Sequence, residues 1–153
     1  MAFQRKQVGE QDAFQKLSAM CASAEHCTYE MMEKMRRWQL PDDAAGRVMQ
    51  RLKDGKFVDD ERYCRAFVLD KIRYNKWGRR KVEQALFMKR IDEGVAQEVL
   101  DEVDGQEYLD VLAPLIESKR KTTKAANDYE LNCKLIRFAL GRGFSMDEIR
   151  SVL

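Results

Sequence analysis

Residues 82–99, which read VEQALFMKRIDEGVAQEV, decide the fold of this chain. Their apolar residues recur every four positions, break once, and then recur every four positions again. They are Val82, Leu86, Ile91, Val95 and Val99. Because such spacing places side chains on one face of a helix, the stretch predicts two amphipathic helices joined by a short turn.

The same spacing occurs twice more along the chain. The positions 51 residues earlier are also apolar: Met31, Met35, Leu40, Ala44 and Val48. The positions 53 residues later form a looser third copy: Leu135, Ala139, Phe144, Glu148 and Val152. Glu148 is the exception in this copy, and the neighbouring Ile149 is a suitable substitute for it. A pattern that returns about every 50 residues predicts tandem structural repeats.

A further helical stretch precedes each of the first two helix pairs. Residues 12–24 are expected to bury Phe14, Leu17 and either Met20 or Cys21. Residues 60–74 are expected to bury Tyr63, Phe67 and either Leu69 or Ile72. The predicted fold is therefore all-α, with three tandem three-helix repeats in an elongated, curved array. The expected parts are an N-terminal extension (1–10) and repeats at 11–55, 56–104 and 105–153.

Residues that start and interrupt helices agree with these boundaries. Ser145 and Glu148 have the spacing of a capping box at the start of a helix. Pro41, followed by two aspartates, suits a helix first turn. Pro114 lies inside an otherwise helical stretch and is expected to kink that helix or restart it.

The composition is that of a water-exposed helical protein. Charged residues make up 35% of the 153 residues and hydrophobic ones 44%, with 8 glycines and 2 prolines. No uncharged run is long enough to span a bilayer, and the first twenty residues do not have the pattern of a signal peptide. We expect a cytoplasmic monomer that makes no membrane contact.

The four cysteines are Cys21, Cys27, Cys64 and Cys133, and none forms a C-x-x-C pair. In a cytoplasmic chain they are expected to be reduced, structural thiols. Cys21, His26 and Cys27 lack a second pair of ligands that would complete a tetrahedral zinc site. Neither a metal nor a cofactor is expected.

Charge is distributed unevenly around a formal net charge of only +2. Residues 62–90 carry ten basic and two acidic residues, a local charge of +8, whereas residues 92–110 carry eight acidic residues and no basic one. One interpretation is that these are solvated helix faces whose charges partly pair after folding. The other is a bipolar surface whose basic side meets phosphate or an acidic protein face.

The basic stretch contains the predicted surface for a partner or DNA: Arg73, Lys76, Trp77, Arg79, Arg80, Lys89 and Arg90. Trp77 either fills a pocket between helices, which we favour, or stacks on a base. Two arginines at the start of a helix oppose its macrodipole, which suggests a functional reason for Arg79 and Arg80. A second basic cluster, Lys119, Arg120, Lys121 and Lys124, is more typical of an exposed helix end.

Catalytic residues are not expected anywhere in the chain. The single histidine, His26, belongs to no recognisable nucleophile motif, and the carboxylates lack partners that would hold a substrate. Neither a phosphate-binding loop nor a dinucleotide-binding glycine pattern is present. The sequence therefore favours a protein that is not an enzyme.

Two segments resemble the RecX family. The first runs from Lys56-Phe57-Val58-Asp59-Asp60-Glu61-Arg62-Tyr63 through Ala66-Phe67-Val68 and Asn75-Lys76-Trp77-Gly78 to Lys81-Val82. The second is Arg142-Gly143-Phe144-Ser145 with Ile149, Val152 and Leu153. With the threefold pattern, the resemblance covers about residues 11–153. The chain departs from the family pattern at Lys89-Arg90-Ile91, where a Lys-Gly-Ile turn is expected, and at Cys64, where a small residue is usual.

The resemblance implies three tandem three-helix repeats and a negative regulator of the RecA recombinase. Such a protein binds the RecA filament, contacts single-stranded DNA weakly, and suppresses ATP hydrolysis and strand exchange in DNA recombination, DNA repair and the SOS response. A rival hypothesis is a helical DNA-binding module that acts alone, and a third is a structural adaptor. Reversal of Arg79 and Arg80 to glutamate is expected to weaken the effect on RecA.

Overall fold

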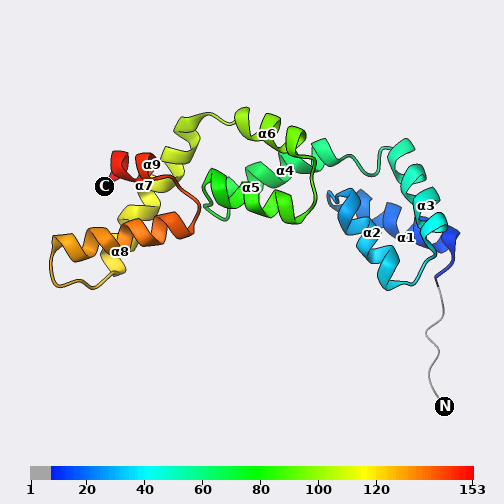
Figure 1. Cartoon of the computed structure of the whole chain (residues 1–153), viewed down its shortest axis with the longest axis horizontal. Coiled ribbons are helices and arrows are strands. Elements are labelled where there is room, and N and C mark those ends of the chain that lie inside the picture. Colours follow the sequence, from blue (N-terminus) through cyan, green and yellow to red (C-terminus); the bar gives the residue numbers. More distant parts are fainter. Residues whose placement is uncertain (1–7) are drawn as a thin grey trace, which may run out of the picture. The chain divides into compact units, whose positions relative to one another are not determined.

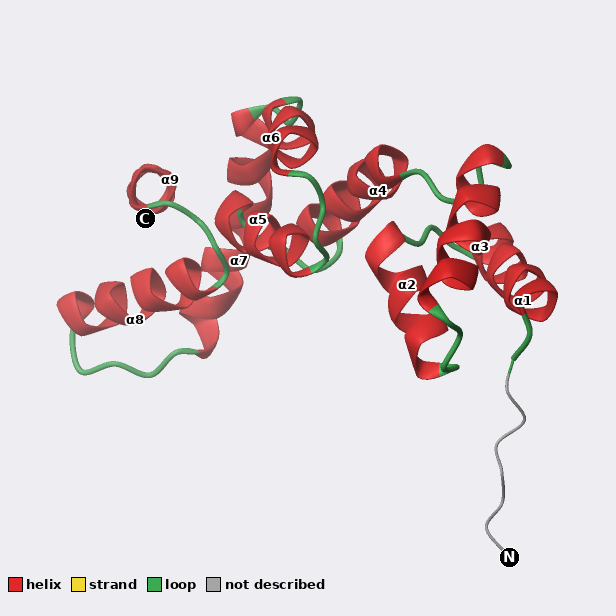
Figure 2. Ribbon diagram, turned by 45° about the vertical axis from the view of Figure 1, so that its right-hand side comes forward, coloured by secondary structure: helices red, strands yellow, loops and turns green. Residues whose placement is uncertain are grey.

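The computed structural model describes residues 8–153, and within this range it contains nine α-helices and no strand (Figures 1 and 2). The helices are α1 (Glu10–Ser23), α2 (Thr28–Arg37), α3 (Asp42–Asp54), α4 (Asp60–Arg73), α5 (Arg79–Met88), α6 (Glu93–Asp101), α7 (Gly105–Thr122), α8 (Asp128–Gly141) and α9 (Met146–Val152). The predicted all-helical fold is confirmed. Residues 1–7 of the expected N-terminal extension lie outside the described residues.

The first of two compact units contains residues up to 63 together with 89–91. Helices α1 and α2 both pack against α3 in this unit. Its core is formed by apolar side chains from all three helices and the segments after them: Ala13, Leu17, Met31, Met35, Leu40, Ala44, Ala45, Val48, Met49, Leu52 and Val58. Burying each of the larger ones stabilises the fold by roughly 1.5–3 kcal/mol.

The second unit contains residues 64–88 and 92–153, which include most of α4 and all of α5 to α9. Helix α5 packs against α6, and α7, α8 and α9 pack against one another. Cys64, Val68 and Ile72 form a fully buried stripe along α4. The boundaries of the three predicted repeats and the curvature of their array stay predictions.

Most apolar positions of the repeat pattern lie in the cores of these units, whereas Val95 and Val152 are only half-buried. Val82 and Leu86 of the central copy are fully buried, as are Leu135 and Ala139 of the third. Ile149 is also fully buried, whereas Glu148 is only half-buried. The expected substitution of Ile149 for Glu148 is therefore confirmed, because α9 turns Ile149 rather than Glu148 toward the core.

The predicted helix signals have different outcomes. Ser145 Oγ accepts a hydrogen bond from the Glu148 amide (3.1 Å) and Glu148 Oε1 accepts one from the Ser145 amide (2.8 Å), which confirms the capping box. Pro41 is the residue just before α3.

Helix α7 continues through Pro114, so of the two expected outcomes the restart is wrong and the kink stays a prediction. Pro114 is exposed, and the backbone carbonyl that its ring leaves unpaired therefore lies near solvent.

Arg62 has a structural role in residues 56–63, which belong to the first segment that resembles the RecX family. Its Nη2 donates to the carbonyl oxygens of Lys56 (3.0 Å) and Phe57 (3.2 Å), and its Nε donates to Glu25 Oε1 (2.8 Å). Asp60 Oδ1 accepts hydrogen bonds from the backbone amide and hydroxyl of Thr28 at the start of α2. These residues hold the turn between α3 and α4 together, which is a structural role.

Candidate partner-binding surface

The loop from α4 to α5 places the predicted surface residues, and it is fixed by the loop from α8 to α9. The Gly78 amide donates to the Arg142 carbonyl (2.8 Å), and the Arg80 amide donates to the Gly143 carbonyl (3.2 Å). These acceptors satisfy amides at the start of α5 that have no partner within their own helix. Gly78 is buried, and the contact leaves no room for a side chain there.

Trp77 is half-buried in the same loop and is held between two lysines. Its ring lies 5.3 Å from Lys71 Nζ and 4.7 Å from Lys81 Nζ, and its amide donates to the Lys71 carbonyl. Cation–π contacts of this kind favour a fixed ring. Of the two interpretations of Trp77, the arrangement supports packing between α4 and α5.

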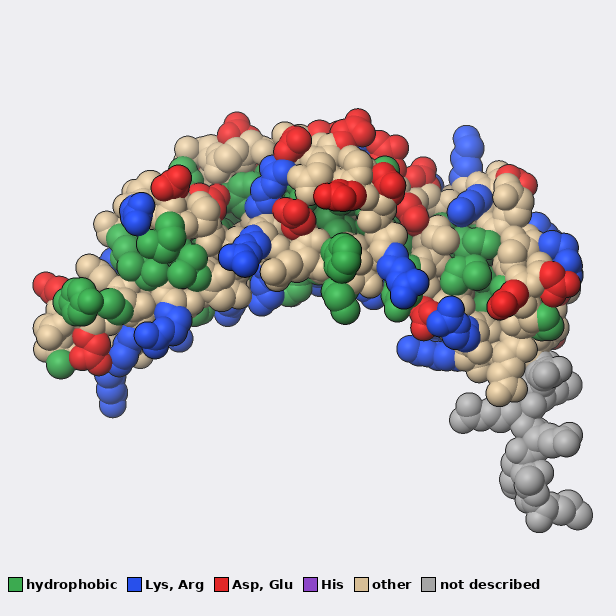
Figure 3. Space-filling model, in the orientation of Figure 1, with side chains coloured by type: hydrophobic (Ala, Val, Ile, Leu, Met, Phe, Trp, Pro, Cys, Tyr) green, Lys and Arg blue, Asp and Glu red, His purple; other side chains and the backbone are tan. Residues whose placement is uncertain are grey.

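Three arginines of the basic stretch form ion pairs with the acidic stretch that follows it. Arg65 pairs with Glu102 (2.9 Å), Arg73 with Glu107 (3.1 Å) and Arg79 with Asp101 (2.7 Å). The hydrogen bond from Arg65 holds the pKa of Glu102 below its ordinary value. Figure 3 shows acidic side chains over and around α6, with basic ones between them. The charges of residues 62–90 and 92–110 therefore partly pair with each other, which agrees with the interpretation of these stretches as solvated helix faces.

The remaining predicted residues fall into two groups. Arg80 is exposed, and its guanidinium makes no ion pair or hydrogen bond within residues 8–153. Lys76 is exposed, and its ammonium donates to the Arg73 carbonyl (2.6 Å). Lys89 and Arg90 belong to the first unit, where Lys89 lies 3.5 Å from Glu30 and Arg90 lies over the Tyr29 ring.

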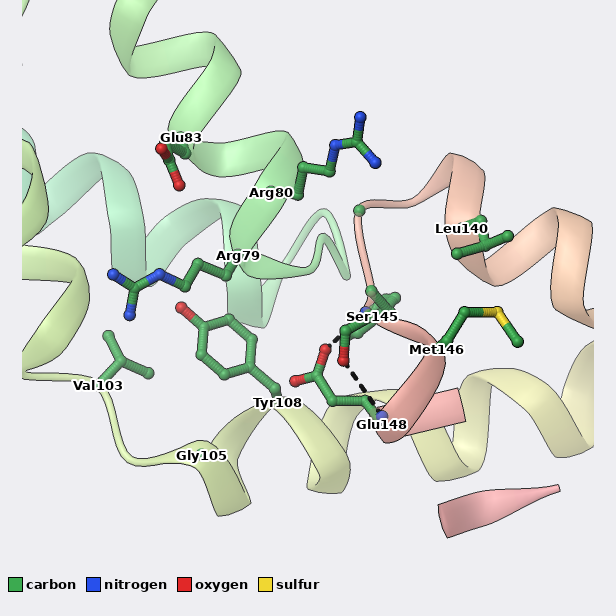
Figure 4. A pocket seen from close by; sticks show the side chains of 12 residues that line it. Arg79, Arg80, Glu83, Val103, Gly105, Tyr108, Leu140, Ser145, Met146 and Glu148 are labelled. Atoms are coloured by element: carbon green, nitrogen blue, oxygen red, sulfur yellow. Dashed lines mark hydrogen bonds between the residues drawn. The ribbon is translucent and has the colours of Figure 1, made fainter. Parts of the chain in front are cut away.

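A pocket of about 660 Å³ lies beside Arg80, between the start of α5, α7 and the α8–α9 loop (Figure 4). Arg79 and Arg80 point in opposite directions from the start of α5, and Tyr108 points from α7 toward Arg79. The Tyr108 hydroxyl is buried without a hydrogen-bond partner among the described residues. Burial raises the pKa of Tyr108 to about 12, although the nearby Arg79 opposes this shift.

A second hollow, of about 590 Å³, follows the outer face of α5. It is lined by residues of that helix alone: Arg80, Glu83, Gln84, Phe87 and Met88. The exposed fractions of Phe87 and Met88 are 79% and 71%. Sequence reasoning missed both residues, although a signal was present: they are large apolar residues outside the buried stripe of Val82 and Leu86.

The second basic cluster is less neutralised than the first. Arg120 pairs with Glu117 (3.5 Å), and Lys119 lies over the Phe138 ring at 4.9 Å. Lys121 and Lys124 are less tightly held, and within residues 8–153 their ammonium groups meet no carboxylate.

Two further properties concern the described residues as a whole. Residues 8–153 contain no group of three or more His, Cys, Asp or Glu residues that could hold a metal ion. None of the helices in this part of the chain is long and apolar enough to cross a membrane. The four cysteines are free thiols, with Cys27 and Cys64 buried and Cys21 and Cys133 half-buried.

Taken together, the fold and the surface define a class: all-helical proteins whose surface exposes cations and large apolar side chains of α5. Two family models match this chain. "RecX, second three-helix domain" matches residues 59–100, and "RecX, third three-helix domain" matches residues 106–153. Together they cover more than half of the chain, which therefore belongs to the RecX family.

Similar proteins from several bacteria carry the name "Regulatory protein RecX". That of Clostridium perfringens strain 13 is 27% identical over 97% of this chain and 72% of its own length. That of Finegoldia magna is 29% identical over 80% of this chain and 61% of its own length. That of Chlorobium phaeobacteroides is 26% identical over 94% of this chain and 93% of its own length.

Two crystal structures have the same fold. RecX from Lactobacillus salivarius superposes with a TM-score of 0.80 at 18% identity, over 94% of this chain and 93% of that one. A second regulatory protein RecX superposes with a TM-score of 0.86 at 15% identity, over 94% of this chain and 72% of that one.

Proposed function

We propose that this chain is a negative regulator of the RecA recombinase. It binds the RecA filament on single-stranded DNA and suppresses the filament's ATP hydrolysis and strand exchange. The match of two successive RecX three-helix domains over most of residues 59–153 carries this proposal. The name "Regulatory protein RecX" of relatives that align with nearly the whole chain supports it.

The protein acts by binding rather than by catalysis in this proposal. Its contact surface includes exposed cations of the α4–α5 region, of which Arg80 is the most available because no carboxylate within residues 8–153 neutralises it. Arg73 and Arg79 are less available, since each is held in an ion pair. Contact of this region with single-stranded DNA is weak, because few cations of α4 and α5 remain outside ion pairs to replace counterions along the phosphates. The cytoplasmic location and monomeric state stay predictions.

A helical DNA-binding module that acts without RecA is the second candidate. Lys121 and Lys124 favour it, because they meet no carboxylate within residues 8–153 and would meet phosphate on naked DNA equally well. The two functions differ in what they require. A regulator needs RecA for its effect, whereas a DNA reader distinguishes one naked duplex sequence from another.

The deciding experiment adds the protein to RecA on single-stranded DNA with ATP and measures ATP hydrolysis and strand exchange. We expect both rates to fall as the protein approaches equimolar amounts with RecA. Binding to duplexes of different sequence is measured in parallel. Unchanged RecA activity over this range would contradict the regulator, and a strong preference for one duplex would favour the second candidate.

A further inference from the structure

The two hollows beside α5 form one continuous surface of the second unit. Both are lined by Arg80 and Glu83, so the apolar outer face of α5 leads directly into the pocket next to Tyr108. We call this surface the α5 groove. It contains three of the seven large hydrophobic residues that are exposed among residues 8–153: Phe87, Met88 and Leu140.

The exposure of Phe87 and Met88 has no explanation within the fold. Val82 and Leu86 of the same helix are fully buried and supply its core contacts, so Phe87 and Met88 are not needed there. A partner that covers these two side chains would remove their apolar surface from water, which favours a complex. Neighbouring apolar side chains that stay exposed are typical of a surface that binds a protein.

The charged side chains that line the groove have both signs, and they differ in how they are held. Arg79 is neutralised by Asp101, and Glu83 Oε1 accepts a hydrogen bond from Gln97 Nε2 (3.1 Å). Glu148 is held in the capping box with Ser145, and like Glu83 it keeps its negative charge, because its hydrogen-bond partner is neutral. Among the described residues that line the groove, Arg80 alone offers an unpaired positive charge, and it lies beside the apolar face of α5. A carboxylate that enters the groove would meet the Arg80 guanidinium.

We propose that the α5 groove binds a segment of a protein partner that presents apolar side chains on both sides of a carboxylate. The apolar side chains cover Phe87, Met88 and Leu140, and the carboxylate pairs with Arg80. This inference rests on the proposed function, in which the segment belongs to RecA subunits of the filament. Nucleic acid fits less well, because a phosphate backbone requires several unpaired cations and the described part of the groove has one.

The test compares two double variants that each remove two exposed, large side chains. Phe87→Ala with Met88→Ala empties the apolar end of the groove. Tyr74→Ala with Tyr129→Ala is the matched control, since both tyrosines are 80% exposed and line neither hollow. Circular dichroism confirms that each variant is folded, and the readouts are binding to RecA filaments, inhibition of ATP hydrolysis, and binding to naked single-stranded DNA.

For the groove variant we expect the protein concentration that gives half-maximal filament binding and inhibition to rise about tenfold. At many interfaces the loss of a few anchoring side chains has an effect of this size. The tyrosine control should stay within about twofold of the wild type. Arg80→Glu should weaken filament binding more than Arg80→Lys, because lysine keeps the charge opposite the carboxylate.

Each other outcome overturns the inference in a distinguishable way. If the wild type inhibits RecA and the groove variant inhibits equally well, the groove is not the contact and the proposed function stands. If the groove variant loses naked DNA binding in parallel with filament binding, the occupant is nucleic acid rather than protein. If the wild type has no effect on RecA, the proposed function fails, and the inference fails with it.

Discussion

Gly78 and Gly143 lie so close that a methyl group on Gly78 would stand 2.5 Å from both the carbonyl carbon and the carbonyl oxygen of Gly143. Gly143 in turn has a φ of +95°, and a side chain there would meet Lys81 Cβ at 2.5 Å. This contact joins the α4–α5 loop to the α8–α9 loop. Both glycines are part of the segments that resemble the RecX family, and the close approach of the two backbones is the physical reason for them.

Gly78→Ala should destabilise the protein. The added methyl group overlaps backbone atoms that cannot rotate away, so the two loops must separate and lose the hydrogen bond from Gly78 to Arg142. We expect the free energy of unfolding to fall by about 1–3 kcal/mol, the usual cost of overpacking. Urea unfolding followed by circular dichroism measures the change.

Gly141→Ala is the matched control for this prediction. Gly141 ends α8, close in sequence to the same loop, and an added methyl group would meet nothing within 4 Å. Because alanine is the better helix former, this variant should be as stable as the wild type or up to about 1 kcal/mol more stable. Equal losses in both variants would mean that the Gly78 contact is not the cause.

The repeat pattern predicted the helices and most of the core from the sequence. The sequence also predicted that Ile149, the apolar neighbour of the pattern position Glu148, takes its place in the core, which the structure confirms. In α4 the expectation was less accurate. Of its two alternatives Ile72 is buried and Leu69 is exposed, and Phe67 is only half-buried. The fully buried stripe instead follows residues four positions apart along the helix: Cys64, Val68 and Ile72.

The partner-binding surface was harder to predict, because the spacing of neighbouring residues in the sequence does not show which distant charges form ion pairs. Arg65 and Glu102 are 37 residues apart, and Arg79 and Asp101 are 22 residues apart. The sequence showed both charge stretches but not which residues meet. The α5 groove depends on which apolar residues stay outside the core, and the periodic pattern describes only those inside.

Arg79 and Arg80, which sequence reasoning treated as one unit, should behave differently. Arg79→Glu replaces an ion pair with two facing carboxylates, that of the introduced side chain and that of Asp101, and should lower the free energy of unfolding by about 1 kcal/mol. Arg80→Glu breaks no side-chain hydrogen bond or ion pair within residues 8–153 and adds a favourable charge at the start of α5, so stability should be unchanged or slightly higher.

Thermal unfolding and RecA inhibition, measured on both single variants, separate these two effects. We expect Arg80→Glu to weaken inhibition while it leaves the melting temperature unchanged. A loss of inhibition confined to Arg79→Glu would instead move the contact to the side of α5 that faces Asp101.

Arg90→Gly should relieve a strained backbone. Arg90 has a φ of +55°, a conformation that costs a residue with a side chain about 1–2 kcal/mol, and Gly143 occupies the equivalent turn 53 residues later. The comparison is with Arg90→Ala, because both variants lose the guanidinium that lies over Tyr29 and only glycine relieves the strain. Chemical unfolding should show the glycine variant about 1 kcal/mol more stable than the alanine variant. Equal stabilities would show that this turn carries no strain.

Glu30 should make stability depend on pH in the acid range. Burial raises its pKa, but a hydrogen bond from the Cys27 amide and the charge of Lys89 outweigh that effect, and the net pKa is lowered. A carboxylate whose folded pKa lies below its unfolded value stabilises the fold at neutral pH. That contribution is lost as the pH falls through the lowered pKa.

Glu30→Gln keeps a side chain that can cap Cys27 but removes the charge opposite Lys89. We expect it to lower stability by about 1 kcal/mol near pH 7, and the difference from the wild type should shrink toward zero once the pH is below the lowered pKa of Glu30. Glu33→Gln, which breaks only a surface pair with Arg36, should change stability by a few tenths of a kcal/mol. A difference for Glu30→Gln that persists undiminished in acid would show that the charge is not responsible.

Binding to single-stranded DNA should depend on the unpaired cations more than on the paired ones. Lys121→Gln with Lys124→Gln removes two charges that meet no carboxylate within residues 8–153, whereas Arg65→Gln with Arg73→Gln removes two that are paired with Glu102 and Glu107. Both double variants lower the net charge equally, so long-range attraction changes by the same amount. Only the unpaired lysines can release counterions from phosphate without first breaking an ion pair.

The measurement is the affinity for single-stranded DNA over a range of salt concentrations. Each phosphate contact contributes about −0.7 to the slope of log affinity against log salt concentration. The slope of the lysine variant should therefore be shallower by the equivalent of about one to two phosphate contacts. The slope of the arginine variant should change much less. Equal losses would mean that net charge, rather than these two lysines, controls binding. Exposed cations that bind a phosphate backbone in water must displace its counterions, so their binding weakens as salt is added. If the affinity of the wild type does not change with salt, the protein contacts no phosphate.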